Sequence, residues 1–162
     1  MEFSDFIKNR VCFMKKNFLI SLAILFAFML QSFADTREAD RILGFWFTEN
    51  NKSKVEIYIK DGKYFGKIVW LKIPNNEEGK PKVDKHNPNP EERNKPLLGL
   101  LLIKDFVYDE DDVWNDGYIY NPEDGKTYTS KMTLKDEGKT LNVRGYVGIS
   151  LFGKTTIWKR AE

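Results

Sequence analysis

Gly44-Phe45-Trp46 and Trp158-Lys159-Arg160 bracket the part of this chain that is expected to fold. Between them lie short runs of alternating apolar and polar residues, separated by Gly, Asp, Asn and Pro. A Gly-x-Trp on a first strand and an aromatic–cation pair on a last strand are typical of a small antiparallel barrel that closes by pairing the two. The Trp46 indole would then lie under the Arg160 guanidinium in a cation–π contact.

Eight segments have the pattern of short strands. The clearest is 53–60, which places Val55, Ile57 and Ile59 on one face, and the Asp61-Gly62 pair after it predicts a tight hairpin turn. No window after the first 34 residues shows the apolar period of a helix. We predict strands at 42–48, 53–60, 63–72, 98–107, 113–120, 126–134, 139–147 and 154–160.

Short strands with tight turns are compatible with a sandwich or a barrel. Consecutive hairpins favour an up-and-down meander, and closure of that meander removes its exposed edges. We therefore predict an all-β fold: an eight-stranded antiparallel up-and-down barrel, formed by residues 35–162 as a single domain, with one long lid loop.

The first 34 residues have the pattern of a cleaved signal peptide. Lys15 and Lys16 precede an apolar stretch at 18–30, and Ser32-Phe33-Ala34 supplies small residues for cleavage after Ala34. Met14 is the expected true start, because the acids in 1–13 are unusual before such a stretch. We predict export to the periplasm or the extracellular space, with no transmembrane segment after cleavage; the alternative is an uncleaved anchor.

Cleavage would remove the only cysteine, Cys12, so the mature chain would have neither a disulfide nor a thiolate metal site. The whole chain has 26 basic and 24 acidic residues. Removal of residues 1–34 leaves 22 of each sign, because four cations and two acids lie in that segment. A net charge near zero removes any general argument for nucleic acid or an anionic membrane as a partner.

Residues 73–96 form one long polar connection that holds five of the six prolines. A loop of this length is usually a functional lid or a disordered segment. Asn89-Pro90-Glu91-Glu92 is typical of a helix start, with Asn as N-cap and Pro at the first position, and predicts a single helical turn. We expect the loop to fold over one barrel mouth, anchored by Asp84, Asn87 and Arg93; the alternative is a disordered linker.

The sequence offers little for catalysis or metal binding. His86 is the only histidine and lies in the Pro-rich loop, where a solvated side chain is the expected state. The acidic run 109–112 does not match a calcium loop, because Val113 and Trp114 stand where oxygen ligands are needed. Neither a nucleophile motif nor paired strand carboxylates are present. We predict no catalytic residue, no metal and no cofactor, and therefore a protein that is not an enzyme.

Aromatic residues recur at alternate positions, at Trp114, Tyr118 and Tyr120, and again at Tyr128 after the next turn. An eight-stranded barrel has a lumen just wide enough for side chains or one small ligand, and Tyr groups at its mouth are suited to line a pocket. The alternative is ordinary core and cross-strand packing.

The motifs resemble a bacterial family, the domain of unknown function numbered 2147, over essentially the whole mature chain. They are Ile42-Leu43-Gly44-Phe45-Trp46, Asp84-x-x-Asn87-Pro88, Arg93-x-x-Pro96-Leu97-x-Gly99, the block 117–128, the block 141–148, and Gly153 with Trp158-x-Arg160. Asn121 departs from the pattern, since Asp is expected before the Pro, which is only a turn change. The resemblance implies a secreted, lipocalin-like or streptavidin-like barrel, and that 84–99 is a shared structural unit; it implies no established activity.

The leading functional hypothesis is a non-enzymatic binding module of the cell envelope that holds a small hydrophobic or lipidic molecule in the lumen under the lid. The candidate ligand-binding residues are Asp84, Asn87, Arg93, Tyr120, Tyr128, Arg144 and Tyr146. Strict alternation places Arg144 on the outside unless Gly145 marks a bulge. The alternative is an interaction module with a packed barrel that contacts other envelope proteins through the two-faced apolar segment 98–103.

Overall fold

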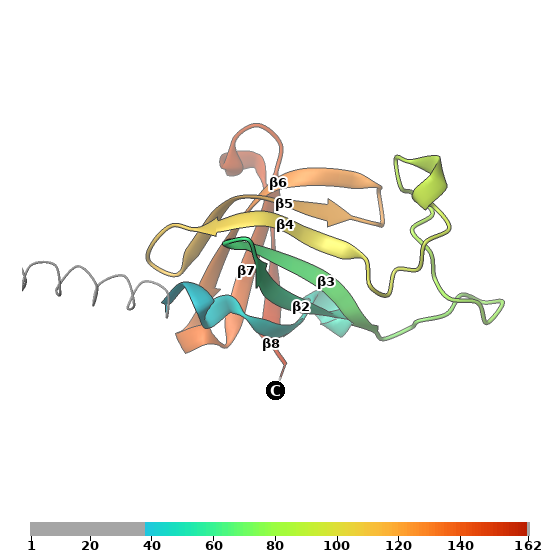
Figure 1. Cartoon of the computed structure of the whole chain (residues 1–162), viewed down its shortest axis with the longest axis horizontal. Helices are drawn as coiled ribbons and strands as arrows, with labels where there is room; N and C mark the ends of the chain where they lie inside the picture. The colour runs from blue at the N-terminus through green and yellow to red at the C-terminus, as the bar shows by residue number, and fades with distance from the viewer. Residues whose placement is uncertain (1–37, 162) are drawn as a thin grey trace, which may run out of the picture. The chain divides into compact units, whose positions relative to one another are not determined.

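The computed structural model describes residues 38–161, which form a closed barrel of eight antiparallel strands in sequence order (Figure 1). The strands are β1 Gly44–Phe47, β2 Ser53–Lys60, β3 Lys63–Leu71, β4 Leu101–Tyr108, β5 Val113–Asn121, β6 Lys126–Lys135, β7 Thr140–Tyr146 and β8 Lys154–Arg160. Five short 3-10 helices accompany them: η1 Asp40–Ile42, η2 Glu49–Asn51, η3 Pro90–Glu92, η4 Asp136–Gly138 and η5 Ser150–Phe152. The predicted fold class is confirmed, while the predicted signal peptide lies outside the described residues.

Two predicted strands begin two or three residues later than their apolar patterns suggested. Ile42 is fully buried but belongs to η1, so β1 starts only at Gly44. The fourth strand starts at Leu101 rather than Leu98, because Gly99 adopts a left-handed φ of 90° that interrupts the extended chain. The predicted Asp61-Gly62 hairpin turn is present, with φ values of 51° and 74° at its two residues.

The barrel closes where the first and last strands meet, as the sequence predicted. Trp46 pairs with Arg160 across β1 and β8, and the guanidinium carbon lies 4.2 Å from the centroid of the indole. The same guanidinium donates through Nε to the Gly138 carbonyl at 2.6 Å and through Nη1 to the Leu43 carbonyl at 3.0 Å. The Arg160 guanidinium therefore connects the last strand to the start of β1 and to the η4 turn.

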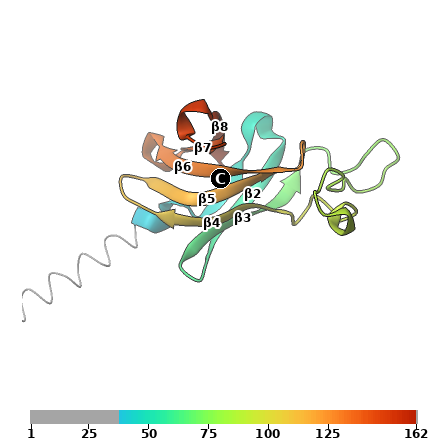
Figure 2. The same ribbon diagram turned by 90° about the horizontal axis from the view of Figure 1, so that it is seen from above.

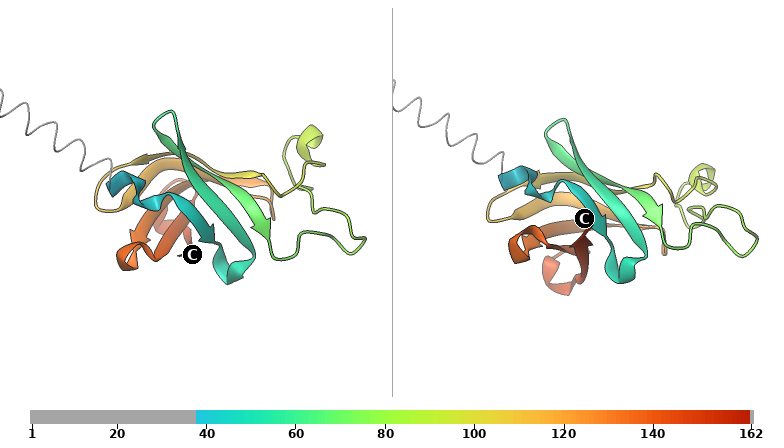
Figure 3. Two further views of the ribbon diagram at one scale, coloured as in Figure 1. Left: turned by 60° about the horizontal axis from the view of Figure 1, so that its bottom comes forward. Right: turned by 90° about the horizontal axis from the view of Figure 1, so that it is seen from below.

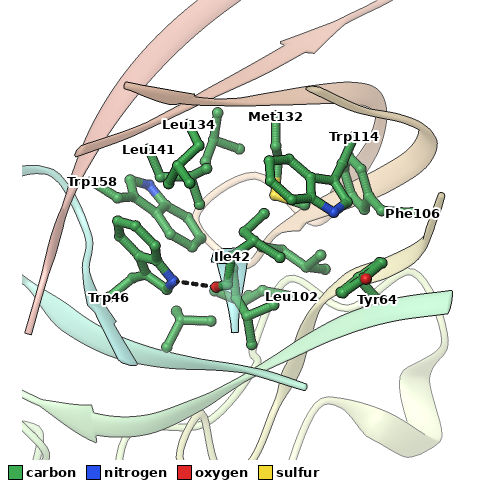
Figure 4. Close-up of a cluster of buried hydrophobic side chains, with 14 of the residues drawn as sticks. Ile42, Trp46, Tyr64, Leu102, Phe106, Trp114, Met132, Leu134, Leu141 and Trp158 are labelled. Atoms are coloured by element: carbon green, nitrogen blue, oxygen red, sulfur yellow. Dashed lines mark hydrogen bonds between the residues drawn. The ribbon is translucent and has the colours of Figure 1, made fainter. Parts of the chain in front are cut away.

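Large side chains occupy the barrel interior (Figure 4). Trp46, Phe106 and Trp114 are fully buried, and the Trp46 indole N–H donates to the Ile42 carbonyl at 2.8 Å. The ring of Phe106 lies so close to Gly117 that a Cβ there would be 2.1 Å from it. These side chains thus fill part of the interior in which the sequence analysis had expected a ligand.

The segment before β1 packs at the end of the barrel that carries the β4–β5 turn (Figure 3). Arg41 pairs with Asp112 of that turn at 2.7 Å, and the Tyr64 hydroxyl donates to Asp40 at 3.0 Å. Burial, followed by the bond to the Asp40 carboxylate, raises the pKa of Tyr64. Within residues 38–161, no helix has the length and apolarity needed to cross a bilayer.

Candidate functional site: a pocket between the long loop and the outer face of the barrel

The connection between β3 and β4 leaves the barrel beyond the ends of these two strands (Figures 1 and 2). It folds back on itself: Val83 and Pro96 form an antiparallel bridge, and the Asp84 N–H donates to the Lys95 carbonyl at 3.0 Å. The predicted helical turn is η3, whose N-cap Asn89 accepts through its side chain from the Glu91 N–H at 3.1 Å. These internal bonds favour an ordered loop over a disordered linker.

Asp84 attaches the loop to the barrel wall. Its carboxylate is completely buried, and Oδ1 accepts a hydrogen bond of 2.8 Å from the hydroxyl of Tyr120 on β5. Its second oxygen, Oδ2, accepts from the side-chain amide of Asn87 at 2.7 Å. Burial, followed by the bond to Asp84, raises the pKa of Tyr120 to about 12. A buried carboxylate is costly unless both oxygens are bonded, and this one meets that condition.

Arg93 extends the same chain of contacts. Its Nε donates to the backbone carbonyl of Asn87 at 2.8 Å, which ties the η3 end of the loop to the residue that bonds Asp84. The structure therefore brings together four of the predicted site residues: Asp84, Asn87, Arg93 and Tyr120. The expectation that the first three are anchored is confirmed.

A second contact joins the loop to the β5–β6 turn. Gly125 has a φ of 71°, and a Cβ at this position would be 1.9 Å from the carbonyl oxygen of His86. Only a glycine fits both the backbone conformation and the close approach of the loop. The His86 side chain is exposed, as expected for a solvated loop histidine.

Between the loop and the barrel wall lies a pocket of about 580 Å³. Its loop side consists of Asn87, Pro88, Glu92, Lys95 and Pro96, followed by Leu98, Gly99 and Leu100. Its barrel side consists of Leu101, Lys104, Tyr118, Tyr120 and Thr127. This volume is in the range of pockets that bind small molecules.

The pocket lies on the outer face of the barrel, whereas the sequence analysis had expected a site in the lumen. The register is shifted between Trp114 and Gly117, and both residues are buried in the interior. Beyond this bulge the alternation is reversed, so Tyr118 and Tyr120 face away from the side on which Trp114 lies. Strict alternation had put all three aromatic residues on one face, and the bulge separates them.

The charged side chains around the pocket differ in whether they form ion pairs. Glu92 and Lys95 form an ion pair at 2.6 Å with each other. Lys104 is exposed and forms no ion pair among residues 38–161. It lies opposite Tyr118, which is 45 % exposed, in the register of β4 and β5. An ammonium group and a phenol therefore adjoin a wall of Leu98, Leu100 and Leu101, so the arrangement can hold an anion beside an apolar group.

The other predicted site residues lie elsewhere. Tyr128 lies on β6, where its hydroxyl donates to Asp124 at 2.6 Å, and this bond raises its pKa. Arg144 and Tyr146 are on β7, and Arg144 donates to the carbonyls of Ser150 and Leu151. Arg144 is on the outer face, as simple alternation indicated. None of these three side chains lines the pocket.

Sequence reasoning missed Lys95, Lys104 and Thr127, and it read the apolar segment 98–103 as a possible contact for proteins. The signal for Lys104 was present, because it directly follows this apolar run. The segment 98–103 is apolar throughout because its residues lie in two apolar environments. Ile103 is buried in the core, whereas Leu98, Leu100 and Leu101 line the pocket.

A family described as "uncharacterized protein conserved in bacteria", DUF2147, matches residues 44–160. The chain belongs to this family. The match to DUF2147 runs from the first strand to the last and includes the whole long loop. The predicted family is thus confirmed, and the family description supplies no activity.

A solved structure shares the fold of this DUF2147 member. It is protein HP1028 from the human pathogen Helicobacter pylori, described as belonging to the lipocalin family. The TM-score is 0.64 at 28 % sequence identity, over 75 % of this chain and 83 % of that one. The comparison with curated proteins gave no match. A lipocalin-like barrel is typically a binding fold rather than a catalytic one.

Proposed function

We propose that this protein is a non-enzymatic binding module whose site is the outer-face pocket under the long loop. The ligand class is a small amphipathic anion, with its charged group at Lys104 and Tyr118 and its apolar part against Leu98, Leu100 and Leu101. The observation that carries the proposal is the pairing of a lysine that forms no ion pair among the described residues with an apolar wall in a pocket of about 580 Å³. Because Glu92 and Lys95 neutralise each other, Lys104 supplies the excess charge.

A fluorescent amphipathic anion, 1-anilinonaphthalene-8-sulfonate, tests this site. The chain from Asp35 is suitable, because the closed barrel and its core lie within residues 38–161. We expect saturable binding that Lys104→Gln weakens about tenfold, the effect of one charge-assisted contact. Lys60→Gln is the matched control, since Lys60 is exposed in a different hairpin and has no ion pair among the described residues.

Competition with other amphipathic molecules tests whether the ligand must carry a negative charge. Decanoate should displace the probe, whereas decanol, which has the same chain without the charge, should do so much less well. Equal loss of affinity in Lys104→Gln and Lys60→Gln, or binding that does not saturate, would overturn the proposed site. In that case the apolar segment 98–101 would instead favour the alternative function, contact with an envelope protein.

We also propose that the chain is exported, with cleavage after Ala34 and a location in the periplasm or outside the cell. The support is the pattern of charge, apolar stretch and small residues in the first 34 positions. N-terminal sequencing of the protein from fractionated cells should find Asp35 in the envelope fraction. An intact N-terminus in the cytoplasmic fraction would contradict this proposal.

A further inference from the structure

The β7–β8 loop, residues 147–153, carries a concentration of exposed apolar side chains. Val147 is 76 % exposed, Ile149 59 %, Leu151 76 % and Phe152 79 %. Exposed apolar residues that are scattered singly over a surface need no explanation, but four within six positions on one loop do. This loop is separate from the pocket, whose lining includes none of its residues.

The loop is held in shape by one side chain. Arg144 donates through Nε to the Ser150 carbonyl at 2.8 Å, through Nη2 to the Leu151 carbonyl at 3.1 Å and through Nη1 to the Thr155 hydroxyl at 2.8 Å. The Gly153 N–H also donates to the Ser150 carbonyl at 3.1 Å. These bonds partner backbone groups that would otherwise resist transfer to an apolar medium. The loop therefore combines apolar side chains with a partly satisfied backbone.

Two cations flank the loop, which itself contains no charged residue. Arg144 and Lys154 lie on β7 and β8 at the end of the hairpin that carries the loop. The other cations of the hairpin, Lys139, Lys159 and Arg160, lie at its opposite end. Lys154 directly follows the loop, is exposed and forms no ion pair among residues 38–161. Exposed apolar groups next to cations complement an anionic lipid surface.

We propose that the β7–β8 loop docks this protein onto the surface of an anionic lipid bilayer. Leu151 and Phe152 enter the interfacial region, and Lys154 remains at the level of the headgroups. The binding is peripheral and rests on the loop alone, so it stands independently of the pocket and its ligand.

A single fluorophore on the loop tests the docking directly. The chain from Asp35 contains no cysteine, since Cys12 is the only one, so Leu151→Cys provides a unique site for an environment-sensitive dye. With vesicles of phosphatidylcholine and phosphatidylglycerol in equal parts, we expect a blue shift and a gain in intensity. Pure phosphatidylcholine vesicles or high salt should reduce both. The same dye at Ile73→Cys, a 63 % exposed position outside the β7–β8 loop, should not respond.

Co-sedimentation with the same vesicles measures how much individual side chains contribute to membrane binding. Leu151→Ser with Phe152→Ser should lower partitioning by at least about tenfold, because two large apolar side chains are lost. Lys154→Gln should lower it about fivefold, the effect of one headgroup-level cation. Ile73→Ser is the matched control and should bind like the natural chain. All four positions are exposed, so the folded barrel should remain intact.

Three results would overturn the proposal. The first is the absence of binding to the anionic vesicles, and the second is equal binding by the natural chain and the double variant. The third is a concentration-dependent dimer, seen without lipid and abolished by the double variant, which would assign the loop to a second copy of this chain instead.

Discussion

The β1–β8 seam, where the first and last strands pair, and the long β3–β4 loop are each held by one charged side chain. The two side chains differ in how many parts of the protein they connect. In the seam, the Arg160 guanidinium covers the Trp46 ring and donates to the Gly138 and Leu43 carbonyls. In the loop, the Asp84 carboxylate accepts from the Tyr120 hydroxyl and the Asn87 amide. Arg160 thus joins the segment before β1 and the η4 turn to the last strand, whereas Asp84 joins one loop to one strand.

This difference separates global from local stability. Contacts that close the barrel contribute to every strand, because an opened seam exposes two strand edges and the core behind them. Contacts that hold the loop contribute to a local equilibrium, in which the loop can open while the barrel stays folded. Changes in the seam should therefore lower the melting temperature, and changes in the loop should be visible mainly in protease sensitivity.

The largest effect is expected from a chain that ends at Thr156. It loses Trp158, which is 3 % exposed, together with Arg160, so the seam cannot form. The loss of one buried Trp alone costs about 3–5 kcal/mol, a large share of the stability of a small domain. Thermal unfolding followed by circular dichroism should show this destabilisation. A chain that ends at Arg160 is the control, and equal melting of both would show that the barrel does not close at this seam.

A smaller, local effect is expected from Asp84→Ala. The change leaves the Tyr120 hydroxyl and the Asn87 amide without their partner, at a cost of about 1–3 kcal/mol. Trypsin should then cut after Lys82 and Lys85 faster than in the natural chain, while the melting temperature falls less than on truncation. Adding Tyr120→Phe should recover part of the loss, because it removes one unsatisfied group. An unchanged cleavage rate would contradict the anchoring role of Asp84.

Gly125→Ala tests the second contact of the loop. The new methyl group would meet the His86 carbonyl, and the φ of 71° disfavours a residue with a side chain, so a cost of about 1 kcal/mol or more is expected. Gly62→Ala provides the comparison, since that turn also has a positive φ but nothing lies within 4 Å of the added atom. Hydrogen exchange in residues 82–97 should rise in the first variant only; the same rise in both would attribute the effect to backbone strain.

The smallest effect concerns pH. Because the pKa of Tyr120 is raised from 10.0 to about 12, its contribution to stability is fully present below pH 10 and is lost as the pH rises toward 12. Absorbance of tyrosinate should show a late-titrating group that Tyr120→Phe removes and that Asp84→Ala moves to lower pH. Tyr64, whose pKa is also raised, should keep titrating late in both variants. A titration in which Tyr120→Phe leaves the late group unchanged would contradict the buried bond.

Local sequence predicted most of the barrel because the turns and the alternation are local properties. Asp61-Gly62 favours a primed turn whatever its surroundings, and the strands at 53–60 and 154–160 have their predicted bounds. The loop residues Asp84, Asn87 and Arg93 were also found, since short-range bonds join them: Asp84 to Asn87, and Asn87 to Arg93.

The location of the site could not be obtained in the same way. Lys104 and Tyr118 come from different strands and meet through the pairing of β4 with β5, which no local pattern in either strand specifies. Tyr128 had been grouped with Tyr120 because both lie near strand ends at one turn, and Arg144 because it is a cation on a late strand. Their hydrogen bonds lie with Asp124 and with the β7–β8 loop, respectively.

By itself the sequence determined the strand order, the hairpins and the closure by Trp46 and Arg160, because these follow from alternation, turn chemistry and the pairing of the chain ends. Tertiary structure alone decided on which face of β5 the Tyr120 side chain lies. The shift between Trp114 and Gly117 lets Phe106 pack on the glycine and reverses the alternation beyond it. A single extra residue in a strand exchanges its two faces, and interior packing rather than local pattern selects where that residue is placed.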